Sequence, residues 1–561
     1  MILKIKKEIQ ENILQALEEL GIVYAGKISV ENPDVLKMGD FSSNIAMVLS
    51  KQEKTCPREL AQQIITKIQP NQNIAKVEVA GPGFINFFLS KKYFSDFVND
   101  EHLNLNILKN KKFLIEHSSP NLFKPFHIGH LVNNAVGESL FRVFQFAKAD
   151  IKQISFPSDK SLGIAKTVWG LKHKMQQEKN ELVFDIKSFG DAYVLGTQEF
   201  EKSEDVKNEV IQINKDIYNE EGENFEIYKK GVEISKQYFL DITKRLGSRF
   251  DGFIYESESE EVGKEIIQNN IGKVFKKSEG AIIFEGSKYG VYDNVFINSD
   301  GFATYSGKDL GLLQKKFSLY DFDKSITLTD IEQKGHFQVV KKAAGLIEKS
   351  WEEDSEYISH GRLGFAGNVK ISSRYGNVPL AADLIDKVKE SIKEKIKDRD
   401  FEKKEQEEIM EKLAIGTLKY TILKVSCGKN MVFDFQKALS LQGNTESYLN
   451  YSLVRALSVL EKTNQENTKE DAQKTSDVSE FEQNLCRFDD IILKVIESYS
   501  PHHLANYLHQ IATDFNSFYA ETKILDQENQ NYLYNLKLTK KFSKIMQKGL
   551  DLLGIQFVEK M

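Results

Sequence analysis

The stretch Ile115-Glu116-His117-Ser118-Ser119-Pro120-Asn121-Leu122-Phe123-Lys124-Pro125-Phe126-His127-Ile128-Gly129-His130 decides the fold of this chain. The apolar run from Phe113 to Ile115 that leads into it predicts a buried parallel strand. A loop with two prolines follows, and from His127 onward apolar residues recur at helical spacing. This order of strand, tight loop and helix predicts a phosphate-binding site in an open α/β sheet, because a helix N-terminus offers free N–H groups and a positive dipole end.

Two histidines at the start of the predicted helix are candidate phosphate ligands. Because His127 and His130 are three residues apart, they share one face at the helix N-terminus. Both imidazoles can therefore donate to phosphate oxygens as negative charge builds up. Gly129 between them has no side chain, so a flat base can lie against the backbone. The four letters His-x-Gly-His alone also arise by chance or in other nucleotidyltransferases.

The wider pattern resembles the HIGH signature of the class I aminoacyl-tRNA synthetases. Glu-x-Ser-Ser-Pro-Asn followed by Lys-Pro-Phe-His-Ile-Gly-His is similar to the form found in arginyl-tRNA synthetases. The resemblance implies that His127, Gly129 and His130 bind ATP and that both histidines act in catalysis together with Lys124. Asn133 and Asn134 depart from the pattern, because many arginyl enzymes have arginine in this region.

A second basic loop, Lys370-Ile371-Ser372-Ser373-Arg374-Tyr375-Gly376-Asn377, resembles the KMSKS loop in its arginyl form. The resemblance implies that the β- and γ-phosphates of ATP are held by Lys370, Ser372, Ser373 and Arg374, with Lys370 also catalytic. Ser373 replaces the second lysine of the general motif, and Tyr375 stands where arginyl enzymes often have lysine. Lys124 resembles the lysine that compensates for this in the family. Taken alone, the loop is better explained as a solvent-exposed turn with incidental lysine and arginine.

Length and composition are those of a multidomain globular protein. The 561 residues suffice for about three to four domains, and 41% hydrophobic and 28% charged residues are ordinary values. The three cysteines, Cys56, Cys427 and Cys486, lack metal-ligand spacing, so we expect a reducing cytoplasm and no metal site. We find no signal-peptide pattern and no apolar run of membrane-spanning length. A net charge of −6 permits an RNA partner without supporting one.

We expect a multidomain α/β protein whose Rossmann-type catalytic domain spans residues 106–385, with a helical insertion at about 160–278. Strand signals resume after the insertion at residues 281–284, 294–297 and 325–329. A small N-terminal α/β domain at 1–105 and an all-helical domain at 386–561 flank it. The family resemblance implies that the first contacts the tRNA elbow and that the last binds the anticodon.

A cationic amino acid dictates the character of its own pocket. A guanidinium has forked donors and a fixed charge, so its site needs a carboxylate. Tyr305 and Asp309 are four residues apart on one predicted helical face, where Asp309 can pair with the guanidinium. The resemblance implies further arginine-binding roles for Glu116, Ser119, Asn121 and Gln333. Charge alone would equally suit lysine, so arginine rests on the resemblance.

The C-terminal region carries a second match to the family. Residues 442–451 resemble Gly-Asn-Thr-Gly-Pro-Tyr-x-Gln-Tyr, with Glu446-Ser447 in place of Gly-Pro and Asn450 in place of Gln. The resemblance implies that tRNA is bound by Tyr448, Tyr451, Arg455 and Tyr519. Aromatic faces of this kind can stack on splayed bases. Core packing is at least as good an explanation for the neighbouring Phe515 and Phe518.

The resemblance implies an arginyl-tRNA synthetase that uses ATP with Mg²⁺ to form arginyl-adenylate. The arginyl group then passes to the 3′-terminal ribose of tRNA(Arg). It further implies a monomer whose activation step needs bound tRNA. One rival is a class I synthetase for cysteine or glutamate, disfavoured by the missing zinc cysteines and by the carboxylates Glu116 and Asp309. The other is a non-catalytic tRNA-binding paralogue, which has no need of His127, His130 and Lys370.

Overall fold

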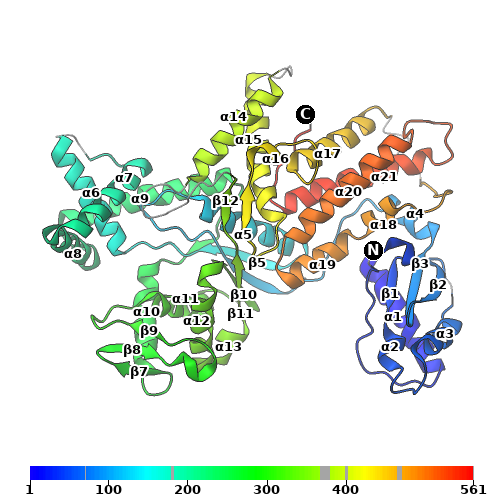
Figure 1. The fold of residues 1–561 in the computed structure, drawn as a ribbon, viewed down its shortest axis with the longest axis horizontal. Helices are drawn as coiled ribbons and strands as arrows, with labels where there is room; N and C mark the ends of the chain where they lie inside the picture. The colour runs from blue at the N-terminus through cyan, green and yellow to red at the C-terminus, as the bar shows by residue number, and fades with distance from the viewer. Residues whose placement is uncertain are drawn as a thin grey trace.

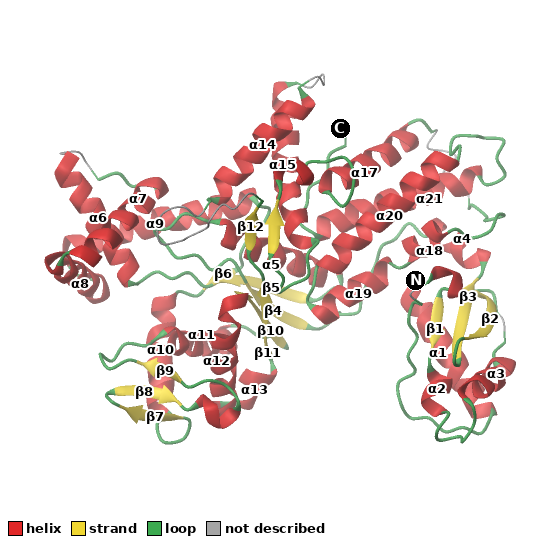
Figure 2. Ribbon diagram, viewed as in Figure 1, coloured by secondary structure: helices red, strands yellow, loops and turns green. Residues whose placement is uncertain are grey.

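A five-stranded parallel sheet lies at the centre of the protein, in a computed structural model that describes residues 1–33, 35–69, 71–178, 182–366, 379–397, 402–463 and 471–559. Helices pack on its faces, and helical or mixed modules extend from it (Figures 1 and 2). The strands are β11 (Ser355–His360), β10 (Lys324–Asp330), β4 (Lys112–Glu116), β5 (Asp150–Ser155) and β6 (Gly252–Phe253), in that order. All four pairings are parallel. The prediction of a parallel strand at 113–115 is therefore confirmed.

The order of the strands fixes where a ligand can bind. From β4 the chain runs to β5 and β6 on one side, and later returns to β10 and β11 on the other side. The topology therefore reverses direction between β4 and β10. In open α/β sheets the ligand crevice lies at such a reversal, beyond the carboxyl ends of the strands. Glu116, the last residue of β4, marks this place.

Helix α5 (Ile128–Phe146) links the sheet to the C-terminal helices. It packs on β5 and β10, and it also contacts α15 (Lys403–Leu423), α19 (Phe488–Ser498) and α21 (Tyr532–Leu552). Its apolar residues are buried on more than one face, as expected for a helix between two layers. The first turn of α5 therefore has a fixed position at the sheet edge, where the ligand crevice is expected.

The predicted helical insertion is present and has its own apolar core. It contains α6 (Leu162–Glu178), α7 (Ile186–Lys202), α8 (Glu204–Asn219), α9 (Gly222–Arg245) and α10 (Glu256–Asn269). Phe123, from the loop after β4, packs into this core against Phe189 and Tyr228. The short strand β6 lies inside the predicted insertion yet joins the central sheet. Two residues are too short for any periodicity to reveal a strand.

One prediction about the central sheet is wrong. Residues 281–284 and 294–297 form β8 (Ala281–Phe284) and β9 (Asn294–Ile297), which belong to a separate antiparallel sheet with β7 (Phe275–Ser278). Glu279 and Gly280 both have positive φ and reverse the chain between β7 and β8, which makes an antiparallel hairpin. This sheet packs with α11 (Tyr305–Leu319), α12 (Lys334–Ile347) and α13 (Lys349–Glu353).

The N-terminal module is an antiparallel sheet covered by helices, as expected. The predicted hairpin is β2 (Ile74–Ala80) and β3 (Phe84–Leu89), and β1 (Phe41–Ser43) pairs with β3. The helices are α1 (Ile2–Glu19), α2 (Ile45–Leu49), α3 (Pro57–Lys67) and α4 (Lys91–Asn99). Asp40 accepts from the Leu89 N–H at 2.7 Å and from Gln483 Nε2 at 2.9 Å. Asp40 therefore joins this module to the C-terminal helices.

The C-terminal region is a helical bundle with one short strand. Its further helices are α14 (Ala381–Ile396), α16 (Phe435–Ala438), α17 (Glu446–Glu461), α18 (Glu480–Cys486) and α20 (His502–Glu521). Strand β13 (Met431–Phe433) lies in the region predicted to be all helical and pairs with β12 (Leu363–Phe365). This pairing connects the catalytic domain to the bundle. Among the helices of the described ranges, none is both long and apolar enough to cross a membrane.

Candidate active site

The two histidines of the predicted phosphate site cap the N-terminus of α5. His127 Nδ1 accepts the Gly129 N–H at 3.0 Å, and His130 Nδ1 accepts the His127 N–H at 3.3 Å. The two rings stack with their centroids 3.8 Å apart. Since both Nδ1 atoms accept hydrogen bonds from the backbone, the proton of each neutral ring is on Nε2. Two Nε2–H donors are therefore held side by side at this helix end.

Both histidines are neutral at physiological pH. Burial, and then the charge of Lys124, lower the pKa of His127 to about 4. Burial and the neighbouring His127 and Lys124 lower the pKa of His130 well below its ordinary value. Neutral imidazoles donate hydrogen bonds without serving as acids at pH 7. The pair is thus suited to stabilise charge on phosphate oxygens.

Lys124 supplies the positive charge near the histidines. Its Nζ lies 4.1 Å from the centroid of the Tyr193 ring on α7. A cation is attracted to an aromatic face at this distance, so Tyr193 restricts the side chain of Lys124. The helical insertion therefore positions a lysine of the loop between β4 and α5. The predicted second loop, with Lys370, Ser372, Ser373 and Arg374, lies outside the described residues.

Asn133 and Asn134, the two departures in α5, hold the loop between β4 and α5. Asn133 Oδ1 accepts the Ser118 N–H at 2.7 Å, and its Nδ2 lies 3.0 Å from the Leu328 carbonyl oxygen and 3.1 Å from His360 Nε2. Asn134 Nδ2 donates to Ser118 Oγ at 3.1 Å. Ser118 has φ = 56°, a strained left-handed value for a residue other than glycine. The asparagines therefore stabilise this backbone and tie it to β10.

The predicted arginine ligands of the first loop have different surroundings. Glu116 is buried and forms an ion pair with the equally buried Lys316 of α11. Thr327 Oγ1 also donates to Glu116 at 3.3 Å. Ser119 Oγ accepts the Phe156 N–H at 3.1 Å, and Asn121 is exposed. Glu116 is thus buried, Ser119 is half-buried and Asn121 is open to solvent.

The remaining predicted arginine ligands lie on α11 and just after β10. Asp309 Oδ2 is 2.5 Å from His336 Nε2, and both side chains are mostly buried. Tyr305 is 75% exposed and so does not cover Asp309. Gln333 is exposed, and its Oε1 accepts the Asp330 N–H at 3.3 Å. The structure therefore places Asp309 in an enclosed setting and leaves Tyr305 and Gln333 at the surface.

Tyr357 shows that Glu116 and Asp309 converge. Burial, and then the negative charges of Asp309 and Glu116, raise the pKa of the Tyr357 phenol. Tyr357 pairs in register with Thr327, which pairs in register with Glu116, so the three residues form one row across β11, β10 and β4. The sequence did not reveal Tyr357, because β11 was not predicted. It also did not reveal Lys316 or His336, whose partners are distant in sequence.

The predicted tRNA-binding residues form a surface cluster on the helical bundle. The Arg455 guanidinium lies 4.5 Å from the Tyr451 ring centroid and 4.7 Å from that of Tyr519, and Arg455 Nη1 donates to Asn516 at 2.6 Å. Tyr451 and Tyr519 are 39% and 40% exposed, so part of each ring is open to solvent beside the guanidinium. Tyr448 packs edge-on against His509 instead. Phe515 is fully buried, in line with a core role.

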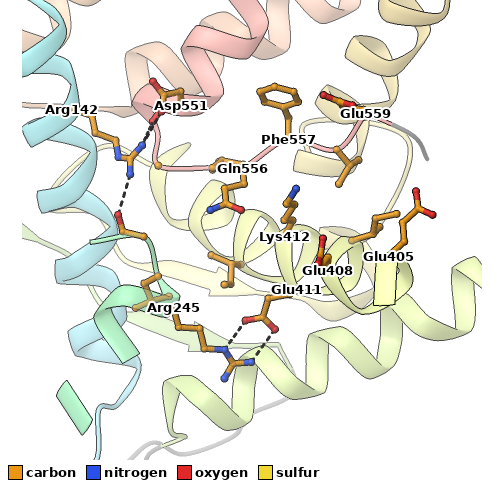
Figure 3. Close-up of a pocket in the computed structure, with 17 residues that line it drawn as sticks. Arg142, Arg245, Glu405, Glu408, Glu411, Lys412, Asp551, Gln556, Phe557 and Glu559 are labelled. Carbon is orange, nitrogen blue, oxygen red and sulfur yellow. Dashed lines mark hydrogen bonds and ion pairs between the residues drawn. The ribbon is translucent and has the colours of Figure 1, made fainter. Parts of the chain in front are cut away.

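A cavity of about 870 Å³ lies away from this site, where α5, α9, α15 and the C-terminal segment meet (Figure 3). Arg142 donates to Asp551 Oδ1 at 2.8 Å and to the Gly247 carbonyl at 3.0 Å. Arg245 donates to Glu411 at 2.6 and 3.1 Å. Both guanidinium groups are thus occupied by protein oxygens. The charged groups around this cavity connect α5 and α9 to the C-terminal bundle.

Comparison with known families agrees with this architecture. Residues 94–435 match the catalytic domain of class I tRNA synthetases of the arginine (R) type, which is more than half of the chain. The chain belongs to the class I arginyl-tRNA synthetases. Residues 7–89 match the arginyl-tRNA synthetase N-terminal domain, and residues 449–561 match the DALR anticodon-binding domain. The family assignment therefore rests on three successive domains.

Relatives of this arginyl-tRNA synthetase align over nearly the full length. The arginine–tRNA ligase of Clostridium acetobutylicum is 30% identical and covers 99% of this chain and 100% of its own. That of Fusobacterium nucleatum is 29% identical and covers 93% of both chains. The fold matches the Thermus thermophilus arginyl-tRNA synthetase (TM-score 0.81, 22% identity, 99% and 100% covered) and the Plasmodium falciparum enzyme (TM-score 0.82, 20% identity, 99% of both covered).

The donor set around the site does not resemble a resident metal centre. In the part of the chain that the structure describes, no group of three or more histidine, cysteine, aspartate or glutamate side chains is arranged to hold a metal ion. The three cysteines are free and far apart in sequence. Class I synthetases use ATP.

Proposed function

We propose that this arginine–tRNA ligase activates L-arginine with ATP at the end of β4 and α5 and then esterifies tRNA(Arg). The observation that carries the proposal is the pair of neutral imidazoles at the start of α5, beside Lys124. Two Nε2–H donors and a helix N-terminus all favour the added negative charge of a phosphate in transition. Asp309, a mostly buried carboxylate on α11, is available for a cationic side chain.

In the first step the arginine carboxylate attacks the α-phosphorus of ATP. A new carboxylate oxygen–phosphorus bond forms, the bond to the β-phosphate oxygen breaks, and pyrophosphate leaves with its electron pair. His127 and His130 stabilise charge on the phosphate oxygens through Nε2–H, and Lys124 adds a positive charge. Lys370, Ser372, Ser373 and Arg374 hold the β- and γ-phosphates, with Mg²⁺ bound to ATP. Gly129 leaves room for the adenine ring.

The amino acid is held at both ends. Asp309 pairs with the guanidinium and Tyr305 closes over it, since an exposed tyrosine can move onto a ligand without disrupting a core. Asn121 and Gln333, both exposed at the sheet edge, bind the α-amino and carboxylate end. Glu116 and Ser119 complete this end of the pocket. Binding arginine at both ends fixes its carboxylate for attack on ATP.

In the second step the terminal ribose hydroxyl of tRNA attacks the adenylate carbonyl, and AMP leaves. The ribose proton passes to the leaving phosphate with substrate assistance, so no protein base is assigned. Tyr448, Tyr451, Arg455 and Tyr519 bind the anticodon by stacking and charge. Residues 1–105 contact the tRNA elbow, residues 106–385 carry out catalysis, and residues 386–561 bind the anticodon. The enzyme acts as a monomer.

Two assays with the purified full-length chain test this function. The first is ATP–pyrophosphate exchange with arginine, with and without tRNA(Arg). The second is esterification of tRNA(Arg) with labelled arginine. We expect arginine-dependent charging, and exchange only when tRNA is present, as in the family. tRNA binding without exchange or charging would instead identify a non-catalytic paralogue, and charging with lysine would overturn the arginine pocket.

A further inference from the structure

The two carboxylates of the amino-acid pocket differ in how their charges are balanced. Glu116 is compensated inside the protein by Lys316, which is 2% exposed and also donates to Thr327 Oγ1 at 2.8 Å. A buried ion pair with an additional hydrogen bond on each partner is electrically satisfied. Glu116 therefore has little charge to offer to a guanidinium.

Asp309 has no such cation. Among the described residues, no lysine or arginine nitrogen lies within 4 Å of its carboxylate, and its partner is the imidazole of His336. Asp309 and Lys316 share one face of α11, seven residues apart, so the two carboxylates are approached from the same side of the sheet. Asp309 is thus the pocket carboxylate that remains open to a cationic substrate.

A row of polar contacts runs from Asn294 through Ser306 to the imidazole of His336. Asn294 Nδ2 on β9 donates to Ser306 Oγ at 2.8 Å, and Ser306 Oγ lies 3.4 Å from His336 Nδ1. His336 Nε2 lies 2.5 Å from Asp309 Oδ2, and because a carboxylate accepts hydrogen bonds, Nε2–H is the donor. Both ring nitrogens of His336 therefore face a polar partner, which fixes the orientation of the ring.

We propose that His336 is a positioning residue for the amino-acid substrate, and this inference rests on the proposed arginine activation. The imidazole fixes one oxygen of Asp309 and leaves the second oxygen for the guanidinium. Three elements, β9, α11 and α12, contribute to this orientation through Asn294, Ser306 and His336. The ring of Phe337, the residue after His336, stacks on Tyr357 with the ring centroids 4.7 Å apart.

The proposal makes the charge of Asp309 a determinant of specificity. L-citrulline has the shape of arginine but carries a neutral urea group in place of the guanidinium. A carboxylate that is oriented and not neutralised selects strongly for the cation. A variant that releases Asp309 from its orientation should therefore lose affinity for arginine while its affinity for ATP is maintained, since ATP contacts the other end of the crevice.

A matched pair of variants in the full-length chain tests this role. His336→Gln places an amide donor near the position of Nε2, whereas His336→Leu removes the donor and keeps a similar volume. We expect H336L to raise the KM for arginine by about 10- to 100-fold, the usual effect of removing a hydrogen bond to a charged group. The KM for ATP and the Kd for tRNA should stay within about twofold. H336Q should recover most of the loss.

Two further variants provide the comparison. Asp309→Asn should raise the KM for arginine at least as much as H336L and should reduce the preference for arginine over citrulline. His173→Leu removes a histidine that stacks on Trp169 in the insertion, and it should leave all constants unchanged. Circular dichroism of each variant verifies the fold.

The outcomes separate this inference from the proposed function. Wild-type charging with arginine establishes the function independently of His336. An unchanged KM for arginine in H336L would then overturn the positioning role. Equal increases in the KM values for arginine and ATP, in H336L and H336Q alike, would also overturn it, because they indicate a structural role only. Absence of arginine charging by the wild type would overturn both.

Discussion

Replacement of Glu446 by glutamine should stabilise the protein relative to the wild type, by a difference in free energy of unfolding that increases as the pH rises. Glu446 is the first residue of α17 and is 1% exposed. Burial raises its pKa to about 8, with Thr417 and Asn450 as its hydrogen-bonding partners. Glu446 and Asn450 are both departures from the family phrase, and they contact each other. The two departures therefore lie against each other in the helix that carries Tyr451 and Arg455.

The direction of this pH dependence follows from how many protons the folded and the unfolded chain bind. Between the ordinary value of 4.5 and about 8, the folded chain retains the proton of Glu446 and the unfolded chain releases it. The wild type therefore loses about 1.4 kcal/mol of stability per pH unit in this window, and Glu446→Gln does not. From pH 5.5 to 7.5 the difference in free energy of unfolding between variant and wild type should grow by about 3 kcal/mol.

Urea-induced unfolding at pH 5.5, 6.5 and 7.5, followed by circular dichroism, measures this difference. Glu461→Gln is the matched control, because Glu461 is exposed at the last turn of the same helix. Its difference from the wild type should not change with pH. A difference for Glu446→Gln that is equally independent of pH would refute the reasoning, because it would mean that Glu446 is ionised in the folded chain.

Three further substitutions test other parts of the account. His127→Ala should reduce adenylate formation by about 100-fold or more in ATP–pyrophosphate exchange and leave the Kd for tRNA unchanged; equal loss of both would contradict a phosphate role. Arg455→Ala should raise the Kd for tRNA(Arg) about 10-fold at fixed salt, measured by fluorescence anisotropy, and an unchanged Kd would remove the cluster from the tRNA interface. Asn133→Ala should lower the free energy of unfolding by about 1–3 kcal/mol in urea, because the buried Ser118 N–H loses its acceptor; no loss would show that the loop is held elsewhere.

Local sequence signals predicted much of the fold. The apolar run at Phe113–Ile115 and the helical spacing after His127 became β4 and α5, since a buried parallel strand and an amphipathic helix each have a clear pattern. The hairpin at residues 77–89 followed from its turn glycines. Strand β6 has two residues and β11 was not recognised, so two strands of the central sheet went unpredicted.

The site was predictable only where the motif is contiguous. His127, His130 and Lys124 lie within seven residues of one another, and the structure brings them together. Lys316 and His336 are paired with Glu116 and Asp309 across 200 and 27 residues. Such pairs depend on how α11 and α12 lie on the sheet, and no spacing in the sequence encodes that arrangement.

Aminoacylation of bulk tRNA with each of the twenty amino acids in turn, with ATP and Mg²⁺, tests the central claim most directly. We expect that arginine alone is esterified to tRNA, because Asp309 is oriented for a guanidinium and Glu116 is already paired with Lys316. Charging with another amino acid, or none at all while tRNA remains bound, would contradict it.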